Sequence, residues 1–188
     1  GGDTVTSFGP TSICISIFGI PNPKGSLLRS GAKVGDGIFV SGTIGDAALG
    51  LMLRGNRSLL CSSKKNSDCI SRYRIPRPRI DLGLALGEVA SAAMDISDGL
   101  FQDLNHLCGA SDVGASVWAN KIPLSKEVNA FITEHKFSIE QVITGGDDYE
   151  LIFTAPVTKE NSIFRMARAT KTRITRIGTI QSGKGISI

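Results

Sequence analysis

The sequence predicts a mixed α/β domain, of the layered α+β kind, in which helices pack on a sheet of about five or six strands. Two observations support this fold class. Segments in which apolar residues occupy every second position, as in a strand, are interspersed with segments that have apolar residues at helical spacing. The 188 residues, 41% hydrophobic and 20% charged, also suffice for one domain with its own core.

The first two strands are predicted from short runs in the N-terminal part of the chain. In Ser12 to Ile20, Ile13, Ile15 and Ile17 fall on alternate positions, which is the period of a strand. After a turn rich in Pro and Gly, residues Gly37 to Ser41 predict a second, short strand.

A helix follows, then a loop and a second helix. Thr43 to Asp46 opens a helical run whose apolar side continues to Leu53. Residues 55–72 lack a sustained period and are dense in Ser, Asn and Lys, so we expect a loop there. Beyond the next prolines, Ile80 to Ala93 has apolar residues at helical spacing.

The remaining elements are predicted by the same two periods. In order, they are a strand at Ala92–Ile96, a helix from Asp98 to near Gly109, a strand at Val113–Trp118, a helix at Lys126–His135, a strand at Tyr149–Thr154, a helix at Glu160–Ala169 and a strand at Ile174–Ile180.

Composition excludes several classes of protein. No apolar run approaches the roughly 18 residues of a membrane span, so we expect no membrane partner. The cysteines Cys14, Cys61, Cys69 and Cys108 lack paired spacing, and two histidines are too few for a zinc framework. Reduced thiols in the cytoplasm are the expectation, with a Cys61 to Cys69 bridge left open.

Charge is unevenly distributed along the chain. Residues 1–50, 51–80, 81–150 and 151–188 carry 0, +7, −9 and +6, within a total of +4. Nucleic-acid binders usually interleave cations with aromatic residues, and here only Tyr73 lies among the cations, so we expect no nucleic-acid partner. The +7 block is expected to be a solvated loop, the alternative being that it faces phosphates or a partner.

The side chains best suited to binding or catalysis are concentrated in the run Met94 to Leu100, MDISDGL. Asp95 and Asp98 stand three residues apart across a predicted strand–helix junction, and two carboxylates in such a place suit magnesium and the phosphates bound with it. A structural interpretation is also open, in which Ser97 or Asp98 is the N-cap of the following helix and Asp95 is solvated.

Three further stretches gain meaning only together. Thr144 to Leu151, TGGDDYEL, combines a flexible turn with carboxylates at a strand entrance, and by itself fits a simple turn. Arg29 could hold a phosphate with two donors or could be an ordinary exposed arginine. Gly1 to Thr4, GGDT, is typical of the middle of a functional loop, so we expect a fragment of a longer protein.

Taken in order, these motifs resemble thiamine monophosphate kinase. GGDT, RSGAKVGDGIFVSGTIGDAALGL, RIPRPRIDLGLAL, MDISDGL, TGGDDYELIFT and ITRIGTI occur in the family's order, and the similarity fails mainly in residues 55–72. Aminoimidazole ribonucleotide synthetases, selenophosphate synthetases and the hydrogenase maturation dehydratase share the glycine-rich SGTIGD type of loop but not MDISDGL with GGDDYEL. The resemblance implies a fold like the C-terminal domain of aminoimidazole ribonucleotide synthetase-like proteins.

The resemblance also implies an activity: transfer of the terminal phosphoryl of ATP to thiamine monophosphate, with several Mg²⁺ ions. Matching positions imply magnesium ligands at Asp3, Asp95 and Asp98, ATP contacts at Gly2, Arg29 and Ser97, and a substrate contact at Asp147. No general base is implied. Residues 1–10 would be the tail of a missing N-terminal ATP and magnesium domain, and residues 11–188 the C-terminal domain of a cytoplasmic homodimer.

The sequence departs from the family in three ways. It lacks the N-terminal domain, has Asp147 where the family usually has Glu, and stops at Ile188 before an aromatic residue near thiamine. We therefore expect this chain alone to fold without catalysing. Two alternatives are another ATP-using member of the superfamily and a non-catalytic binding domain.

Overall fold

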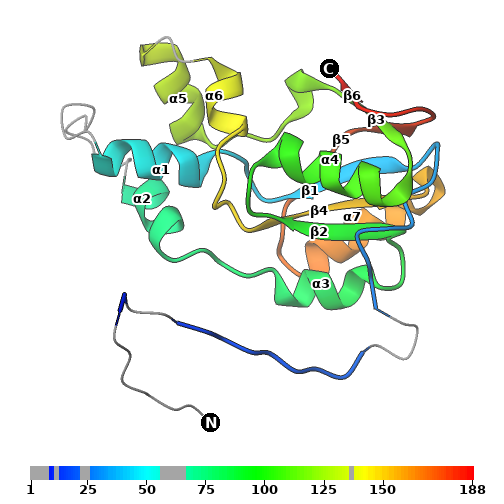
Figure 1. Cartoon of the computed structure of the whole chain (residues 1–188). Helices are drawn as coiled ribbons and strands as arrows, with labels where there is room; N and C mark the ends of the chain where they lie inside the picture. Colours follow the sequence, from blue (N-terminus) through cyan, green and yellow to red (C-terminus); the bar gives the residue numbers. More distant parts are fainter. Residues whose placement is uncertain (1–8, 11–12, 22–25, 56–66, 136–137) are drawn as a thin grey trace.

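A computed structural model describes residues 9–10, 13–21, 26–55, 67–135 and 138–188. Its centre is a six-stranded sheet of order β2-β4-β1-β5-β3-β6, in which every pair is antiparallel except β3 with β6 (Figure 1). The strands are β1 (Gly37–Ser41), β2 (Ala92–Ile96), β3 (Gly114–Val117), β4 (Glu150–Ala155), β5 (Ile174–Gln181) and β6 (Ile186–Ser187). This confirms the predicted mixed α/β class.

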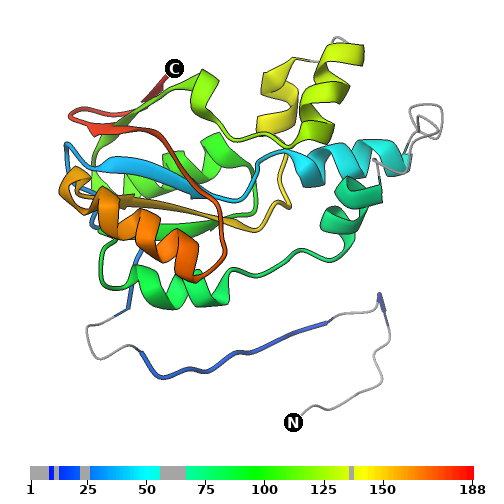
Figure 2. The ribbon, with the colours of Figure 1, turned by 180° about the vertical axis from the view of Figure 1, so that it is seen from behind.

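Helices cover both faces of the sheet. Successive residues of a strand point to opposite sides, and the central strands have apolar residues on both sides that need cover. Ile38 and Val40 of β1 pack beneath α4 (Leu100–Ser111), whereas Phe39 faces α3 (Ile80–Leu86) and α7 (Glu160–Ala169). On that second face Phe39 stacks on Phe153 of β4, with ring centroids 5.3 Å apart. Figure 2, seen from behind, shows α3 and α7 on the side opposite α4.

A smaller helical cluster extends from one end of the sheet. It contains α1 (Asp46–Gly55), α2 (Ser67–Arg74) and α5 (Lys126–His135), with α6 (Ile139–Ile143) beside them, and shares a core around Leu49, Leu53 and Phe131. Two single turns of 3₁₀ helix, Ala119–Lys121 and Val157–Lys159, complete the elements. No helix in the described ranges is both long and apolar enough to cross a bilayer.

Three predictions of secondary structure were wrong in part. Residues 13–20 form no strand, and the side chains of Ile13, Ile15 and Ile17 are 80–89% exposed, because no neighbouring strand pairs with them. The helix expected over Ile80 to Ala93 ends at Leu86, after which the chain turns into β2. Residues 67–72, expected in a loop, lie in α2; residues 56–66 lie outside the described ranges.

Candidate functional site

The end of β2 and the loop that joins it to α4 present the two carboxylates that the sequence singled out. Asp95 is the penultimate residue of β2, at an edge of the sheet, and Asp98 precedes Gly99, the N-cap of α4. Both are exposed. The Asp98 carboxylate accepts a long hydrogen bond from Gln102 Nε2, at 3.4 Å.

Asp103, which no sequence motif singled out, shapes this loop. Its buried Oδ2 accepts hydrogen bonds from the backbone N–H groups of Ser97, Asp98 and Gly99, at 2.9, 3.0 and 3.2 Å. The N-cap Gly99 offers no side chain, so the interpretation of Ser97 or Asp98 as a side-chain cap of α4 was wrong. Asp103 reaches back from the first turn instead and leaves the Asp98 carboxylate at the surface.

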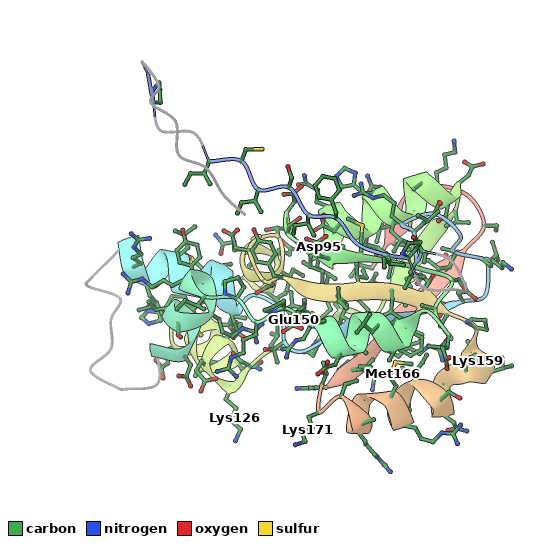
Figure 3. The ribbon with its side chains drawn as sticks, turned by 90° about the horizontal axis from the view of Figure 1, so that it is seen from below. Asp95, Lys126, Glu150, Lys159, Met166 and Lys171 are labelled. Carbon is green, nitrogen blue, oxygen red and sulfur yellow. The ribbon has the colours of Figure 1, made fainter. Side chains whose placement is uncertain are left out.

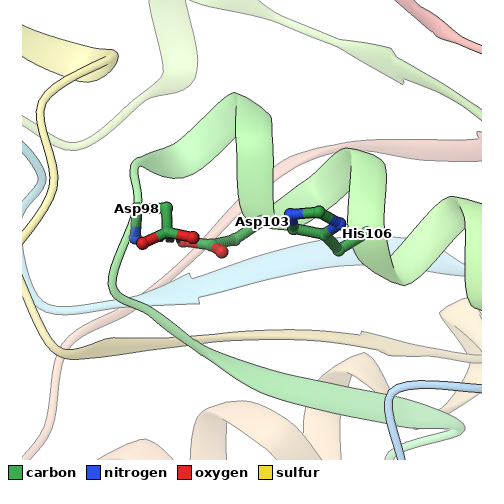
Figure 4. A group of neighbouring side chains, drawn as sticks. All are labelled: Asp98, Asp103 and His106. Carbon is green, nitrogen blue, oxygen red and sulfur yellow. Dashed lines mark hydrogen bonds between the residues drawn. The ribbon is translucent and has the colours of Figure 1, made fainter.

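The donor set of this loop fits a hard cation. Oxygen or nitrogen atoms of Asp98, Asp103 and His106 lie within 4.8 Å of one another (Figure 4). One Asp103 oxygen already accepts hydrogen bonds from three amides, so the exposed carboxylates of Asp98 and Asp95 are the oxygens available to Mg²⁺. Mg²⁺ usually binds only one or two carboxylates and completes its coordination with water and phosphate oxygens. Asp95 is not a member of that three-residue group.

The loop 144–149 packs directly on the Asp95–Asp98 loop. Asp147 N–H donates to the Ser97 carbonyl at 2.9 Å, and Tyr149 N–H donates to the Ile96 carbonyl at 2.8 Å. Glycine permits this approach, since a Cβ on Gly146 would lie 2.3 Å from the Ser97 carbonyl oxygen. The structure therefore brings together Ser97 and Asp147, predicted ATP and substrate contacts.

The backbone of the loop 144–149 is strained at two positions. Asp147 has φ of 69° and Tyr149 has φ of 48°, both in the left-handed region that non-glycine residues avoid. Each such residue costs on the order of 1–3 kcal/mol and persists only where its surroundings hold it.

Asp148, between those two residues, points into the protein and is 3% exposed. Its Oδ2 accepts from Gly45 N–H at 2.7 Å and its Oδ1 from Ala47 N–H at 3.2 Å, at the start of α1. Burial raises the pKa of Asp148 to about 7, while the hydrogen bonds from the two amides and the charge of Arg72 act in the opposite direction.

Glu150, at the start of β4, is the centre of a buried ionic network and is 1% exposed. Arg79 donates to both of its oxygens, from Nε at 2.7 Å and Nη2 at 2.6 Å, and Arg72 Nη2 donates to Oε1 at 2.7 Å. Ser41 Oγ donates to Oε2 at 2.5 Å. Glu150 in turn raises the pKa of Arg79. Figure 3 shows Glu150 where β4 meets the helical cluster.

Arg72 extends this network to α1. Its Nη1 lies 3.2 Å from the buried Asp46 carboxylate, which also accepts from Thr43 Oγ1 at 2.5 Å and from the Cys69 thiol at 3.7 Å. Burial, followed by the charge of Asp46, raises the pKa of Cys69 to about 12, so this thiol stays protonated.

A cleft of about 550 Å³ opens beside the loop 144–149, and its volume suits a small-molecule ligand. The lining residues combine two cations, two aromatic rings, a proline and one carboxylate: Arg54, Arg74, Tyr73, Tyr149, Pro76 and Asp147. Asp147 and Tyr149 therefore face the cleft, while Asp148 and Glu150 are buried behind them.

Comparison with known proteins places this fold in a family. Residues 33–188 match the family described as AIR synthase related protein, C-terminal domain. The chain belongs to that family. This confirms the fold that the sequence motifs implied.

Individual relatives of this AIR synthase related domain are thiamine-monophosphate kinases. The protein of Buchnera aphidicola subsp. Schizaphis graminum (strain Sg) is 40% identical over 196 residues, covering 100% of this chain and 58% of that protein. The crystal structure of thiamine-monophosphate kinase from Stenotrophomonas maltophilia K279a matches with a TM-score of 0.80 and 36% identity, over 88% of this chain and 53% of that one.

A third relative is AaThiL complexed with AMPPCP and TMP, with a TM-score of 0.75 and 35% identity over 85% of this chain and 49% of that one. The chain thus spans about half the length of the relatives it matches. Together they confirm the resemblance drawn from the motifs.

Of the predicted site residues in this AIR synthase related domain, Ser97 and Asp98 lie on the β2–α4 loop, Asp95 lies just before them at the end of β2, and Asp147 lies on the adjoining loop 144–149. Arg29 is exposed beside the far end of α4, where its carbonyl accepts from Ser111 Oγ at 3.4 Å. Gly2 and Asp3 lie outside the described residues.

Sequence reasoning missed the buried members of the site, although their motifs had been noted. Asp148 and Glu150 lie in GGDDYEL, Asp46 ends SGTIGD, and Arg79 ends RIPRPR, yet none had been given a role. Arg72 fell in the stretch expected to be a loop. Charged residues flanking predicted strands were the available signal, because such groups are rarely buried without partners.

Proposed function

We propose that this domain is the substrate-binding and phosphate-binding half of a thiamine-monophosphate kinase. The observation that carries the proposal is the backbone hydrogen bond from Asp147 to Ser97, which joins an acidic loop suited to magnesium and ATP to a cleft suited to a small molecule. The relatives named above and the AaThiL complex with AMPPCP, an analogue of ATP, and TMP support the same activity.

The chemistry of the cleft suits thiamine monophosphate. This substrate has a cationic thiazolium ring, an aromatic aminopyrimidine and a phosphate. Asp147 offers a carboxylate to the cation, Tyr73 and Tyr149 offer faces to the rings, and Arg54 and Arg74 offer donors to the phosphate. Asp147 is one methylene shorter than glutamate, so we propose that it reaches the substrate through water.

The reaction needs positioning more than covalent assistance. A substrate phosphate oxygen forms a bond to the γ-phosphorus of ATP as the bond from that phosphorus to the β,γ-bridging oxygen breaks, giving thiamine diphosphate and ADP. Mg²⁺, when bound, neutralises charge on the transferred group. Asp95 and Asp98 would hold it, together with Asp3, while Gly2, Arg29 and Ser97 contact ATP. The attacking phosphate oxygen is already ionised, so no general base is assigned.

The parent enzyme is proposed to be a cytoplasmic homodimer in which residues 1–10 end a preceding domain. Asp3, Asp95 and Asp98, the three proposed magnesium ligands of this chain, cannot by themselves hold several Mg²⁺ ions, a triphosphate and an acceptor in line. We therefore expect the 188-residue chain to release no ADP with ATP, Mg²⁺ and thiamine monophosphate, and the full-length protein to release it only when the acceptor is present.

Asp95→Asn and Asp98→Asn in the full-length protein test the metal assignment. Each is expected to lower turnover by about a hundredfold, because lost neutralisation acts in the transition state, while unfolding midpoints stay unchanged since both side chains are exposed. Asp112→Asn is the matched control: an 84% exposed aspartate that caps the opposite end of α4 in a left-handed conformation, which asparagine tolerates. Normal turnover of both variants at limiting Mg²⁺ would remove them from the metal site.

A further inference from the structure

The loop 144–149 is attached to the rest of the domain at two kinds of contact. On one side, the backbone N–H groups of Asp147 and Tyr149 donate to the carbonyls of Ser97, in the β2–α4 loop, and Ile96, the last residue of β2, at 2.9 and 2.8 Å. On the other, Asp148 sends its side chain to the start of α1, where Gly45 and Ala47 donate to its two oxygens at 2.7 and 3.2 Å. The second contact joins segments that are about a hundred residues apart in the sequence.

This second contact lies between the two strained residues. Asp147 and Tyr149 have left-handed φ values of 69° and 48°, and neither is a glycine. An unrestrained chain would relax both residues toward the β or right-handed region, which would turn their side chains away from the cleft. Asp148 opposes that relaxation, because its two side-chain hydrogen bonds hold this residue, which lies between the other two, against the start of α1.

We propose that Asp148 is a positioning residue, which holds the left-handed backbone at Asp147 and Tyr149 and so aims both side chains into the cleft lined by Arg54 and Arg74. The role of the cleft as the site for thiamine monophosphate rests on the function proposed above. Asp148 itself is 3% exposed and both of its oxygens face amides, so it does not touch substrate.

Neighbouring contacts make Asp148 separable from the ATP side of the site. Ser97 is bonded to the loop 144–149 at its carbonyl, but its own N–H and those of Asp98 and Gly99 donate to Asp103, and these three bonds do not involve α1. Loss of the Asp148 contact should therefore disturb recognition of the acceptor and leave recognition of ATP nearly intact.

The decisive variant is Asp148→Asn in the full-length protein. An asparagine has nearly the same volume, but its NH₂ group cannot accept, so either Gly45 or Ala47 N–H faces a donor. The KM for thiamine monophosphate is expected to rise about tenfold or more, while the KM for ATP stays within about twofold, because a displacement on the order of 1 Å suffices for such a loss. A KM for thiamine monophosphate within about twofold of wild type overturns the proposal.

A double-mutant cycle with Asp147→Ala separates positioning from general destabilisation. If Asp148 acts through Asp147, adding Asp148→Asn to Asp147→Ala raises the KM much less than it does in the wild-type protein. Effects that multiply fully both with Asp147→Ala and with Tyr149→Ala would show that Asp148 acts by another route and would overturn the proposal.

Amide hydrogen exchange in the 188-residue chain tests the same contact without any enzyme assay. In Asp148→Asn, exchange at Asp147 and Tyr149 should be about tenfold faster, while exchange at Ile152 in the middle of β4 is unchanged. Unchanged exchange at the loop refutes the positioning role. Faster exchange, combined with a full-length wild-type protein that does not phosphorylate thiamine monophosphate, refutes the proposed function and leaves the positioning of the loop established.

Discussion

Replacing Glu150 by Gln should destabilise the domain more than an ordinary polar substitution. The change keeps the shape but removes the negative charge that Arg72 and Arg79 share, and places an NH₂ group against their donors. Breaking a buried ion pair from one side costs about 3–5 kcal/mol. The lower end, about 3 kcal/mol, is expected here because the two arginine side chains retain 26% and 21% exposure, so water solvates part of the released charge.

For a chain of 188 residues, that loss corresponds to a fall in Tm of about 6–12 °C, measured by calorimetry, with the free energy taken from urea unfolding. Lys184→Gln is the control, because it breaks an ion pair with Asp112 in which both side chains are exposed, Lys184 by 86% and Asp112 by 84%. The unfolding midpoint of this variant should not move. In an Arg79→Met background, Glu150→Gln should cost less. A loss below about 1 kcal/mol for Glu150→Gln alone would contradict the argument that the network is desolvated.

Three further predictions follow from glycine packing, from burial and from donor geometry. Gly146→Ala should lower the stability measured by urea unfolding, because its Cβ would lie 2.3 Å from the Ser97 carbonyl oxygen. Gly109→Ala is the control: it lies in α4 with nothing within 4 Å of its Cβ and should stabilise the domain by about 0.5–1 kcal/mol. Equal effects of the two substitutions would contradict the loop contact. Burial raises the pKa of Asp148 from 3.8 to about 7, so the folded state keeps a proton that the unfolded state releases. The resulting stabilisation is complete below pH about 4, is lost as the pH rises through about 7, and is missing from the pH profile of Asp148→Asn in urea unfolding. Arg29→Lys in the full-length protein should raise the KM for ATP, since an ammonium cannot form a two-donor contact, and unchanged KM and turnover would remove Arg29 from the site.

Periodicity predicted those elements whose apolar face meets a neighbour. Gly37–Ser41 and Ala92–Ile96 were predicted at the bounds observed, because every residue of the first strand and both end residues of the second are buried against neighbouring elements. Ser12 to Ile20 has as clear an alternation, but in residues 13–20 nothing pairs with it, and a strand needs a partner for its hydrogen bonds. An alternating pattern shows that a segment can form a strand, but it does not show that a partner strand is present.

Local sequence signatures could also have predicted an element that periodicity missed. Helix α6 begins at a complete capping box, in which Ser138 and Gln141 satisfy each other's backbone N–H groups, and this signature is legible in the sequence. Asp103, by contrast, acts at a distance of four to six residues on the preceding loop. No spacing rule distinguishes it from any other acid in the first turn of a helix.

The acids of the site divide by burial rather than by spacing. Asp95 and Asp98 are exposed, and the sequence predicted them as magnesium ligands because two carboxylates at a strand–helix junction suit that ion. Asp148 and Glu150 are hidden by contacts with residues about 70 to 110 positions away, so their role depends on the tertiary fold. Within GGDDYEL, the half-buried Asp147 lines the cleft, whereas Asp148 and Glu150 are buried and anchor the segment to the rest of the domain.

The same reasoning explains the segregated charge of the chain. The +7 of residues 51–80 and the −9 of residues 81–150 become neighbours, because Arg72 and Arg79 of the first block both bond to Glu150 of the second. This corrects the expectation of a solvated loop for that part of the block. Arg54 and Arg74 of the same block line the cleft with Asp147. Part of the positive charge therefore stabilises the domain internally and part faces a site that also holds a carboxylate, so a basic segment in a sequence does not by itself measure the charge offered to a partner.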